Sequence, residues 1–365
     1  MSATWRPRAT EGGPLAGVRV LDFSELLPGP FLTQSMVELG ADVLKVERPP
    51  HGDAARRMAP ALFQAVNRGK RCLRADLKDD AQRAAVLALA DEADVLVEAY
   101  RPGVIDKLGL GHEAMRARNP RLIHVSLTGY GASGPRAAWP GHDINYLAAS
   151  GSLSLASGSG GTPAFALPVA DLGGAVYALA AVNAALFQRE RTGRGQRLDV
   201  ALTDCMLHWM NTRLAAFRQS GASDLAAQRR TVSARPAYGV FSCADDLPLS
   251  LAALEDHFWR ALVDTLALDA WRGEGYASYA QRMPHAAAIN ADIAAALARL
   301  ERAEALARLA AADVPVAEVL APAELTGHEQ FTARGLYAQT AGGPLCRFPV
   351  RMEGEGAPPE APLTA

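Results

Sequence analysis

The chain lacks the features that mark several large classes of protein. Its four cysteines, Cys72, Cys205, Cys243 and Cys346, form no CxxC pair and have no histidines at metal-ligand spacing, so we expect reduced thiols and no metal site. Thirty-seven basic residues face 39 acidic ones, and the net charge of -2 offers no overall field for holding nucleic acid or an anionic membrane. We therefore expect neither as a partner, and any anionic ligand must be bound by a local cluster of cations.

Long apolar runs are also missing. Residues 1–13 have no apolar stretch of the kind that a secretion signal needs, and no later segment reaches the roughly 18 uninterrupted apolar residues of a membrane span. We therefore expect a cytoplasmic protein. The fractions of 49% hydrophobic and 21% charged residues are those of an ordinary globular chain. A length of 365 residues predicts two domains, or one domain with a large insertion.

The most familiar catalytic motifs are absent as well. The segment after the first expected strand, residues 22–30, reads DFSELLPGP and contains no GxGxxG, which disfavours a nicotinamide or flavin dehydrogenase. The sequence has no Walker-type phosphate loop, no HExxH and no GxSxG. Phosphoryl transfer, zinc-dependent hydrolysis and acyl-serine chemistry therefore have no support in the sequence.

Short apolar runs alternate with helical patterns through the first half of the chain. Strands are expected at 18–23, 42–46, 94–98, 121–127 and 196–200. Helices are expected at 31–39, 79–91, 175–191 and 203–218. This alternation predicts an α/β fold with a doubly wound, mostly parallel sheet.

The pattern changes after this region, which suggests a division into domains. We expect a large α/β domain over 1–205, a connection over 206–235, a smaller α+β domain over 236–320, and a C-terminal segment over 321–365 that returns to the large domain. The Ser/Gly patch at 158–161 is either a mobile active-site loop or a plain surface turn.

Two polar residues lie where an α/β sheet would place a ligand. His142, in the string GHDINY at 141–146, follows a glycine-rich loop after a strand. It is either a proton-transfer group or the cap of a helix that starts near Asp143. Asp171 precedes a long apolar helix, where it is either a helix cap or a catalytic group. The following Gly173-Gly174 pair would let a ligand approach the free amides of that helix.

Several strings together resemble the superfamily of family III CoA-transferases and α-methylacyl-CoA racemases. They are GPLAGVRVLDF at 13–23, LGADVLKVERP at 39–49, NRGKRCLRADL at 67–77, YRPGVIDKLGLG at 100–111, TGYGASGP at 128–135, GHDINY at 141–146 and RTGRGQRLDVALTD at 191–204. The resemblance is strong over residues 13–207 and weaker beyond Pro236. It implies an enzyme that acts on coenzyme A thioesters, with coenzyme A as part of the substrate and no bound prosthetic group or metal.

The resemblance favours the racemase branch, because GHDINY is typical of it. His142 and Asp171 would remove and return a proton on opposite faces of the α-carbon of a 2-methylacyl-CoA, through an enolate. The amides of 171–173 would stabilise the enolate oxygen, and Glu255 would orient His142. The alternative is a CoA-transferase in which Asp171 attacks the thioester and forms an anhydride and then an enzyme thioester. A third possibility is an acyl-CoA binding protein without catalysis.

The resemblance also assigns residues that would bind the coenzyme. They are Arg48, Lys70, Arg101, Arg71 and Tyr146. The two-pronged guanidinium of arginine suits phosphate, so Arg48 and Arg101 are the stronger candidates. The resemblance further implies an interlocked homodimer, with each site built from the large domain of one chain and the small domain of the other. The stretch TVSARPAYGVF at 231–241 departs from the glycine-rich sequence usual in racemases, which leaves the acyl group open.

Overall fold

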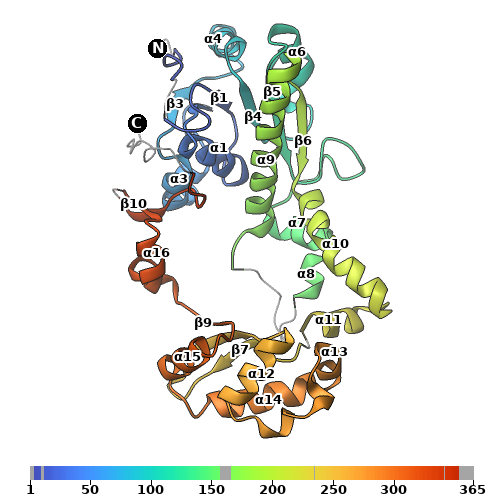
Figure 1. The fold of residues 1–365 in the computed structure, drawn as a ribbon. Coiled ribbons are helices and arrows are strands. Elements are labelled where there is room, and N and C mark those ends of the chain that lie inside the picture. Colours follow the sequence, from blue (N-terminus) through green and yellow to red (C-terminus); the bar gives the residue numbers. More distant parts are fainter. Residues whose placement is uncertain (1–3, 10–11, 157–165, 234, 341, 353–365) are drawn as a thin grey trace. The chain divides into compact units, whose positions relative to one another are not determined.

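The computed structural model describes residues 4–9, 12–156, 166–233, 235–340 and 342–352. The chain forms two compact units (Figure 1), which we call the large unit (Met1–Arg213 with Gln330–Ala365) and the small unit (Leu214–Glu329). The sequence placed these boundaries near 205, 236 and 320. The Ser/Gly patch at 158–161 lies outside the described residues.

A six-stranded parallel sheet forms the centre of the large unit, in the order β3-β2-β1-β4-β5-β6. Its strands are β1 (Arg19–Asp22), β2 (Asp42–Glu47), β3 (Arg71–Arg74), β4 (Val95–Glu98), β5 (Ile123–Thr128) and β6 (Arg197–Ala201). Val20 pairs with Val43 on one side and Val95 on the other, so the strand order reverses between β1 and β4. This arrangement confirms the predicted doubly wound fold, and it places a topological switch point, where such folds bind ligands, at β1 and β4.

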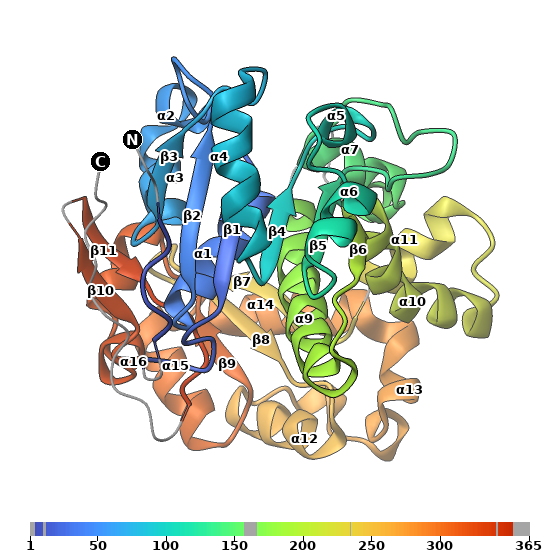
Figure 2. The same ribbon diagram turned by 90° about the horizontal axis from the view of Figure 1, so that it is seen from above.

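Helices cover both faces of this sheet (Figure 2) because successive strand residues point to opposite faces. Val20 packs in one core with α1 (Pro28–Glu38) and α9 (Val169–Thr192). Leu21 packs in the other with α4 (Asp80–Asp91) and α6 (His112–Arg118). The shorter helices of this unit are α2 (Ala55–Met58), α3 (Pro60–Asn67), α5 (Val104–Lys107), α7 (Asp143–Ala149) and α8 (Ser152–Leu155).

Helix α9 is long and apolar enough to cross a membrane by length and composition alone. The core helix of a soluble protein meets the same criterion. Ala178, Val182 and Leu186 of α9 lie in the core that covers the sheet. We therefore describe α9 as a core helix.

The predicted helix at 203–218 is confirmed, and the rest of the predicted connection at 206–235 is largely helical as well. The connection consists of most of α10 (Leu202–Ser220) and of α11 (Leu225–Ser233). From 220 to 234 the sequence shows no clear apolar period, but its Ala, Gln, Leu and Arg residues all favour helix. The boundary between the two units falls within α10.

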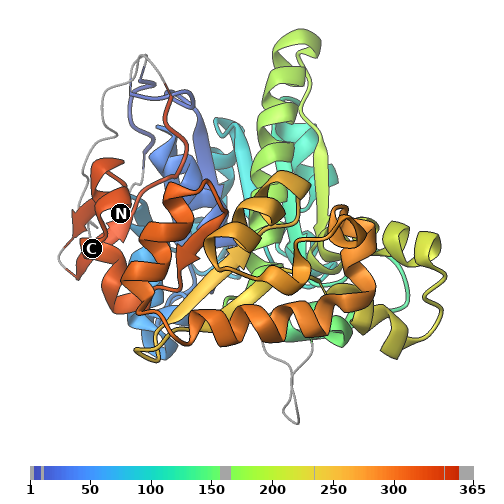
Figure 3. The ribbon, with the colours of Figure 1, turned by 60° about the horizontal axis from the view of Figure 1, so that its bottom comes forward.

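The small unit is an antiparallel sheet packed against helices (Figure 3). Its strands, in the order β7-β8-β9, are β7 (Tyr238–Ser242), β8 (Pro248–Ala252) and β9 (Val316–Glu318). The helices include α12 (Asp256–Thr265), α13 (Tyr279–Arg282), α14 (Ala286–Leu297) and α15 (Arg302–Ala311). Leu249 and Leu251 of β8 share a core with Trp259, Ile289 and Leu309. This confirms the predicted smaller α+β domain.

The C-terminal segment belongs to the large unit from Gln330 onward. After α16 (Glu329–Ala333) it forms a hairpin of β10 (Tyr337–Thr340) and β11 (Gly343–Cys346). The Arg68 Nη2 atom donates a hydrogen bond to the Cys346 carbonyl at 3.2 Å, which ties the hairpin to the end of α3.

Candidate functional site

Two cavities lie at the carboxyl ends of the strands that form the switch point. The first, of about 450 Å³, extends beside the ends of β2 and β3, and we call it the β2-side cavity. The second, of about 530 Å³, extends beside the end of β5, and we call it the β5-side cavity. Glu25 and Leu26, after β1, line both cavities, as do Ala99 and Tyr100 after β4. The two cavities therefore share a wall, and together they offer room for an elongated ligand.

His142 and Asp171 both line the β5-side cavity. His142 is the N-cap residue of α7. Its backbone N–H donates to Asn145 Oδ1 at 3.0 Å, and its backbone carbonyl accepts from the backbone N–H of Asn145 at 2.8 Å. Asp171 lies in the first turn of α9. The structure thus brings the two predicted reacting groups to one cavity, although each comes from a different helix.

The N-terminus of α9 is capped by Asp143 rather than by Asp171. The Asp143 Oδ1 atom accepts hydrogen bonds from the amides of Ala170, at 2.7 Å, and Asp171, at 3.1 Å. Burial and, to a smaller extent, the negative charge of Asp143 together raise the pKa of Asp171 to about 7. This role of Asp143 was not predicted from the sequence, although the residue follows His142 directly in GHDINY.

The prediction that the backbone amides of 171–173 stabilise an enolate oxygen is wrong for residues 171 and 172. The Asp171 amide donates to Asp143, and the Leu172 amide donates to the Pro168 carbonyl at 3.0 Å. A hydrogen bond that is already made within the protein leaves that N–H unavailable to a substrate oxygen.

The Gly173-Gly174 pair also has a different role from the one expected. A Cβ atom on Gly173 would lie 2.7 Å from Met206 Cε, and one on Gly174 would overlap the Leu202 side chain. Both glycines therefore let α9 pack closely against α10, and they do not open the helix to a ligand.

Tyr146 forms part of the wall of the β5-side cavity. Its hydroxyl donates to the Gly141 carbonyl at 2.5 Å, which fixes the residue before His142. Burial raises the pKa of Tyr146 to about 12, with smaller contributions from Asp171, Tyr130 and Asp143, so the phenol stays protonated at neutral pH. Its predicted contact with the coenzyme stays a prediction.

Of the cations predicted to bind the coenzyme, Arg48 and Arg101 reach a cavity. Arg48 lines the β2-side cavity and Arg101 lines the β5-side cavity. Lys78 also lines the β2-side cavity and was missed by the sequence analysis. Its signal was its place soon after β3, since the carboxyl ends of parallel strands meet at one edge of the sheet.

The prediction that Lys70 binds the coenzyme is wrong, because its ammonium is buried within the protein. The Nζ atom donates to Asn67 Oδ1 at 2.8 Å, to the Pro30 carbonyl at 3.0 Å and to Asp22 Oδ2 at 3.2 Å. These three acceptors use all of its hydrogens. Burial lowers the pKa of Lys70 to about 7.

The prediction that Arg71 binds the coenzyme is also wrong. Its Nε and Nη2 atoms donate to the two carboxylate oxygens of Asp42 at 3.2 and 2.7 Å, and its Nη1 atom donates to the Thr4 carbonyl at 2.8 Å. Asp42 is the first residue of β2, so this ion pair lies at the amino end of that strand, away from its carboxyl end.

Glu255 lies in the small unit as the N-cap residue of α12, and its side chain is exposed. Its predicted interaction with His142 stays a prediction. Among the residues that the structure describes, no three His, Cys, Asp or Glu side chains are grouped to hold a metal ion.

Comparisons with known proteins show the family to which this chain is similar. The model of CoA-transferase family III matches residues 15–363. Acetyl-CoA:oxalate CoA-transferase of Acetobacter aceti is 33% identical, covering 96% of this chain and 92% of that protein. Succinate–glutarate CoA-transferase of Agrobacterium fabrum is 32% identical, covering 88% of this chain and 84% of that protein. Human α-methylacyl-CoA racemase is 35% identical, and the match covers 70% of this chain and 65% of the racemase chain.

Solved structures show the same fold over nearly the whole chain. A CaiB/BaiF family protein from Brucella suis superposes with a TM-score of 0.82 at 31% identity, covering 96% of each chain. The Rv3272 protein of Mycobacterium tuberculosis gives a TM-score of 0.85 at 29% identity, covering 97% of each.

Proposed function

Since the chain belongs to CoA-transferase family III, we propose that it transfers coenzyme A from an acyl-CoA to a carboxylic acid, with Asp171 as the nucleophile. The enzyme belongs to a superfamily that includes both CoA-transferases and α-methylacyl-CoA racemases and acts on acyl-CoA substrates. Two relatives named as transferases cover 96% and 88% of this chain, whereas the racemase covers 70%, which favours transfer over the racemisation expected from GHDINY.

The observation that carries the proposal is the position of Asp171 on the β5-side cavity with a pKa raised to about 7. A carboxylate with an ordinary pKa is a weak nucleophile toward a thioester. The raised pKa makes the ionised Asp171 a stronger one, while leaving a substantial fraction ionised at neutral pH.

The first half of the proposed reaction moves coenzyme A onto the enzyme. A carboxylate oxygen of Asp171 attacks the thioester carbonyl carbon, the C–S bond breaks, and coenzyme A leaves as the thiolate, so that a mixed anhydride remains. The thiolate then attacks the Asp171 carbonyl carbon of the anhydride and releases the donor as a free carboxylate. Asp171 now carries coenzyme A as a thioester.

The second half reverses these steps with the acceptor. The acceptor carboxylate attacks the Asp171 thioester, releases the thiolate and forms a new anhydride. The thiolate attacks the acceptor carbonyl carbon, which yields the new acyl-CoA and restores the Asp171 carboxylate. No proton is gained or lost over the whole cycle, and no redox cofactor is needed.

The two cavities suit the two ends of such a substrate. Arg48 and Lys78 supply positive charge for phosphate groups in the β2-side cavity. The uncharged arm of the coenzyme would pass the shared wall at Glu25, Leu26 and Tyr100 and bring its thioester to Asp171. Arg101 and His142 on the β5-side cavity are suited to hold a carboxylate group. Because relatives are named for oxalate and glutarate, a short dicarboxylic acid is the acceptor to test first.

Racemisation is the second candidate, supported by His142 and Asp171 on the same cavity and by the similarity to the human racemase. The two groups would exchange the α-proton of a 2-methylacyl-CoA.

One experiment separates the candidates. The enzyme is incubated in deuterated water with a single epimer of a 2-methylacyl-CoA and a panel of short mono- and dicarboxylic acids. We expect a new acyl-CoA from at least one acid, with the α-proton of the donor retained. Deuterium at the α-carbon with loss of optical purity, and no new acyl-CoA, would establish the racemase. Binding of acyl-CoA with neither reaction would indicate a protein without catalysis.

A further inference from the structure

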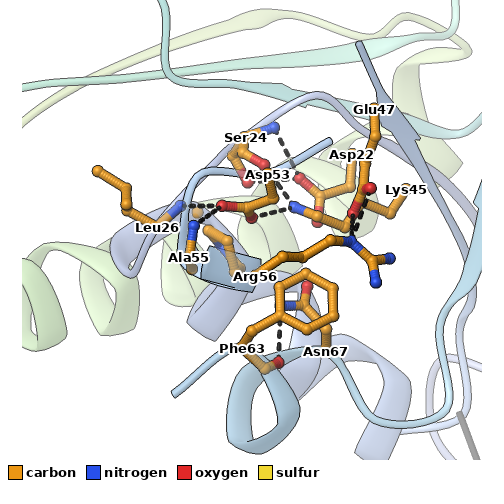
Figure 4. Close-up of polar contacts among 12 residues, drawn as sticks. Asp22, Ser24, Leu26, Lys45, Glu47, Asp53, Ala55, Arg56, Phe63 and Asn67 are labelled. Atoms are coloured by element: carbon orange, nitrogen blue, oxygen red, sulfur yellow. Dashed lines mark hydrogen bonds and ion pairs between the residues drawn. The ribbon is translucent and has the colours of Figure 1, made fainter. Parts of the chain in front are cut away.

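A buried network of charged side chains contacts the backbone that follows β1 (Figure 4). Asp22 and Asp53 are 0% exposed, and Lys45 and Lys70 are 2% and 3% exposed. Burying four ionisable groups is costly even when they are paired, and an apolar core of the same volume is often as stable or more so. The network therefore calls for a role other than stability.

Asp53 and Lys45 hold the chain that leaves β1. The Asp53 Oδ1 atom accepts hydrogen bonds from the amides of Leu26, at 3.1 Å, and Ala55, at 2.9 Å. The Lys45 Nζ atom donates to the Ser24 carbonyl at 2.6 Å and forms an ion pair with Asp53 Oδ2 at 2.9 Å. One ion pair thus fixes the backbone on both sides of Glu25.

The backbone fixed in this way is strained. Leu26 has a φ of 65°, in the left-handed region that branched side chains rarely adopt. A conformation of this kind persists only where the surrounding contacts impose it, and such positions are often found at functional sites. The hydrogen bond from the Leu26 amide to Asp53 is such a contact.

Glu25 and Leu26 line both cavities, so their position sets the shape of the shared wall. The Ala54 amide, next to Asp53, donates a hydrogen bond to the Glu25 carboxylate. The same short segment at 53–55 therefore contacts the backbone of Leu26 and the side chain of Glu25.

We propose that Asp53 and Lys45 are positioning residues, which hold Glu25 and Leu26 in the conformation that lets the arm of coenzyme A pass between the two cavities. This inference rests on the proposed function only in that coenzyme A binds along these cavities. It holds equally for transfer and for racemisation.

The test uses two substitutions of Asp53 in the full chain. Asp53→Asn keeps an oxygen that can accept from the Leu26 amide, whereas Asp53→Ala removes it. Binding of coenzyme A itself is measured by calorimetry, and amide hydrogen exchange of residues 24–28 is measured by mass spectrometry without ligand. We expect Asp53→Ala to bind coenzyme A roughly tenfold more weakly and to lose protection at 24–28, as loss of a buried hydrogen bond would cause. Asp53→Asn should keep most of the affinity for coenzyme A and most of the protection of residues 24–28 from exchange.

A second buried ion pair, between Asp94 Oδ1 and Arg189 Nη1 at 2.9 Å, serves as a matched control. Asp94 directly precedes β4, at the amino end of that strand. Asp94→Asn should lower the melting temperature while leaving coenzyme A binding and exchange at 24–28 unchanged. Should Asp53→Ala prove too unstable to purify, Asp53→Asn with Lys45→Met, which removes both charges, is measured in its place and should weaken coenzyme A binding by a similar factor.

The proposal is overturned if Asp53→Ala, or the Asp53→Asn/Lys45→Met variant measured in its place, binds coenzyme A as the wild type does, or if Asp94→Asn weakens binding equally. A wild type that fails to bind coenzyme A overturns it as well. A wild type that binds coenzyme A without transferring it contradicts the proposed function alone, and the comparison of variants still decides the role of Asp53.

Discussion

The Asp143 carboxylate accepts hydrogen bonds from the amides of Ala170 and Asp171, and its charge lies close enough to the Asp171 side chain to raise the pKa of that residue. Asp143 thus anchors the helix that carries Asp171 and also tunes its proton affinity. In the proposed reaction the first role positions the nucleophile, and the second increases its reactivity.

The pH dependence of the reaction follows from the pKa of Asp171, which burial and Asp143 raise to about 7. Only the ionised carboxylate attacks a thioester. The rate of enzyme acylation should therefore be nearly constant above pH 8 and fall roughly tenfold per pH unit well below pH 7. Rapid-quench kinetics with saturating acyl-CoA measure this rate. A rate that stays flat down to pH 5 would contradict the assignment of this pKa.

Replacing Asp143 should shift this profile. Asp143→Asn removes the negative charge that raises the pKa of Asp171, while the amide oxygen can still accept hydrogen bonds from Ala170 and Asp171. The acidic limb of the acylation profile should move to lower pH. Asp143→Ala removes the hydrogen bonds as well. It should therefore also lower the free energy of unfolding by about 1 kcal/mol through loss of the helix cap. An unchanged limb in Asp143→Asn would show that burial alone sets the pKa.

The raised pKa of Asp171 also makes stability depend on pH. The fold favours the protonated carboxyl, so this stabilising contribution is complete below the ordinary pKa of 3.8 and is lost as the pH rises to about 7. Asp171→Asn cannot ionise and keeps the contribution. The melting temperature of the variant relative to the wild type should therefore increase between pH 5 and pH 8. Calorimetry at pH 5 and pH 8 measures the melting temperatures of both proteins. A difference between them that does not change with pH would count against burial of an ionised Asp171.

His142 distinguishes the two candidate reactions. If Asp171 acts as the nucleophile, His142→Ala should slow transfer by no more than about tenfold, since a general acid or base contributes more than this when it is essential. Exchange of the α-proton, if any is seen in the wild type, should disappear. Parallel assays of transfer and of deuterium incorporation give both values. Complete loss of transfer would require His142 in the chemical step.

Arg48 and Arg71 form a matched pair for coenzyme binding. Arg48 lines the β2-side cavity, whereas Arg71 is paired with Asp42. Loss of a charged hydrogen bond to phosphate should weaken coenzyme A binding roughly tenfold to a hundredfold in Arg48→Ala. Arg71→Ala should leave binding unchanged and lower the melting temperature. Calorimetry on both variants measures the two affinities, and equal weakening would show that Arg71 also binds the coenzyme.

The fold could be predicted from the sequence because its signals are local and repeated. The apolar runs around Val20, Val43 and Val95 are long enough to mark strands, and helical patterns separate them, so a parallel sheet follows. Helix α11, by contrast, could not be predicted in this way. Its composition favours helix, but no apolar period marks a buried face.

The site was predicted only in part, because a sequence gives the types of residue but not the direction in which side chains point. His142 and Asp171 were found, and the structure places both on one cavity. Lys70 and Arg71 look like phosphate ligands in NRGKR, yet Asp22 and Asp42 pair with them. These carboxylates are distant in sequence, so no local pattern reveals the pairing.

The central claim is that Asp171 becomes covalently modified during turnover, and trapping tests this most directly. The enzyme is mixed with acyl-CoA in the absence of an acceptor, quenched with hydroxylamine and digested, and the peptide that contains Asp171 is examined by mass spectrometry. The account predicts a hydroxamate at Asp171, formed from the anhydride or the thioester, and none in Asp171→Asn. An unmodified Asp171 in an enzyme preparation that transfers coenzyme A once an acceptor is added would contradict it.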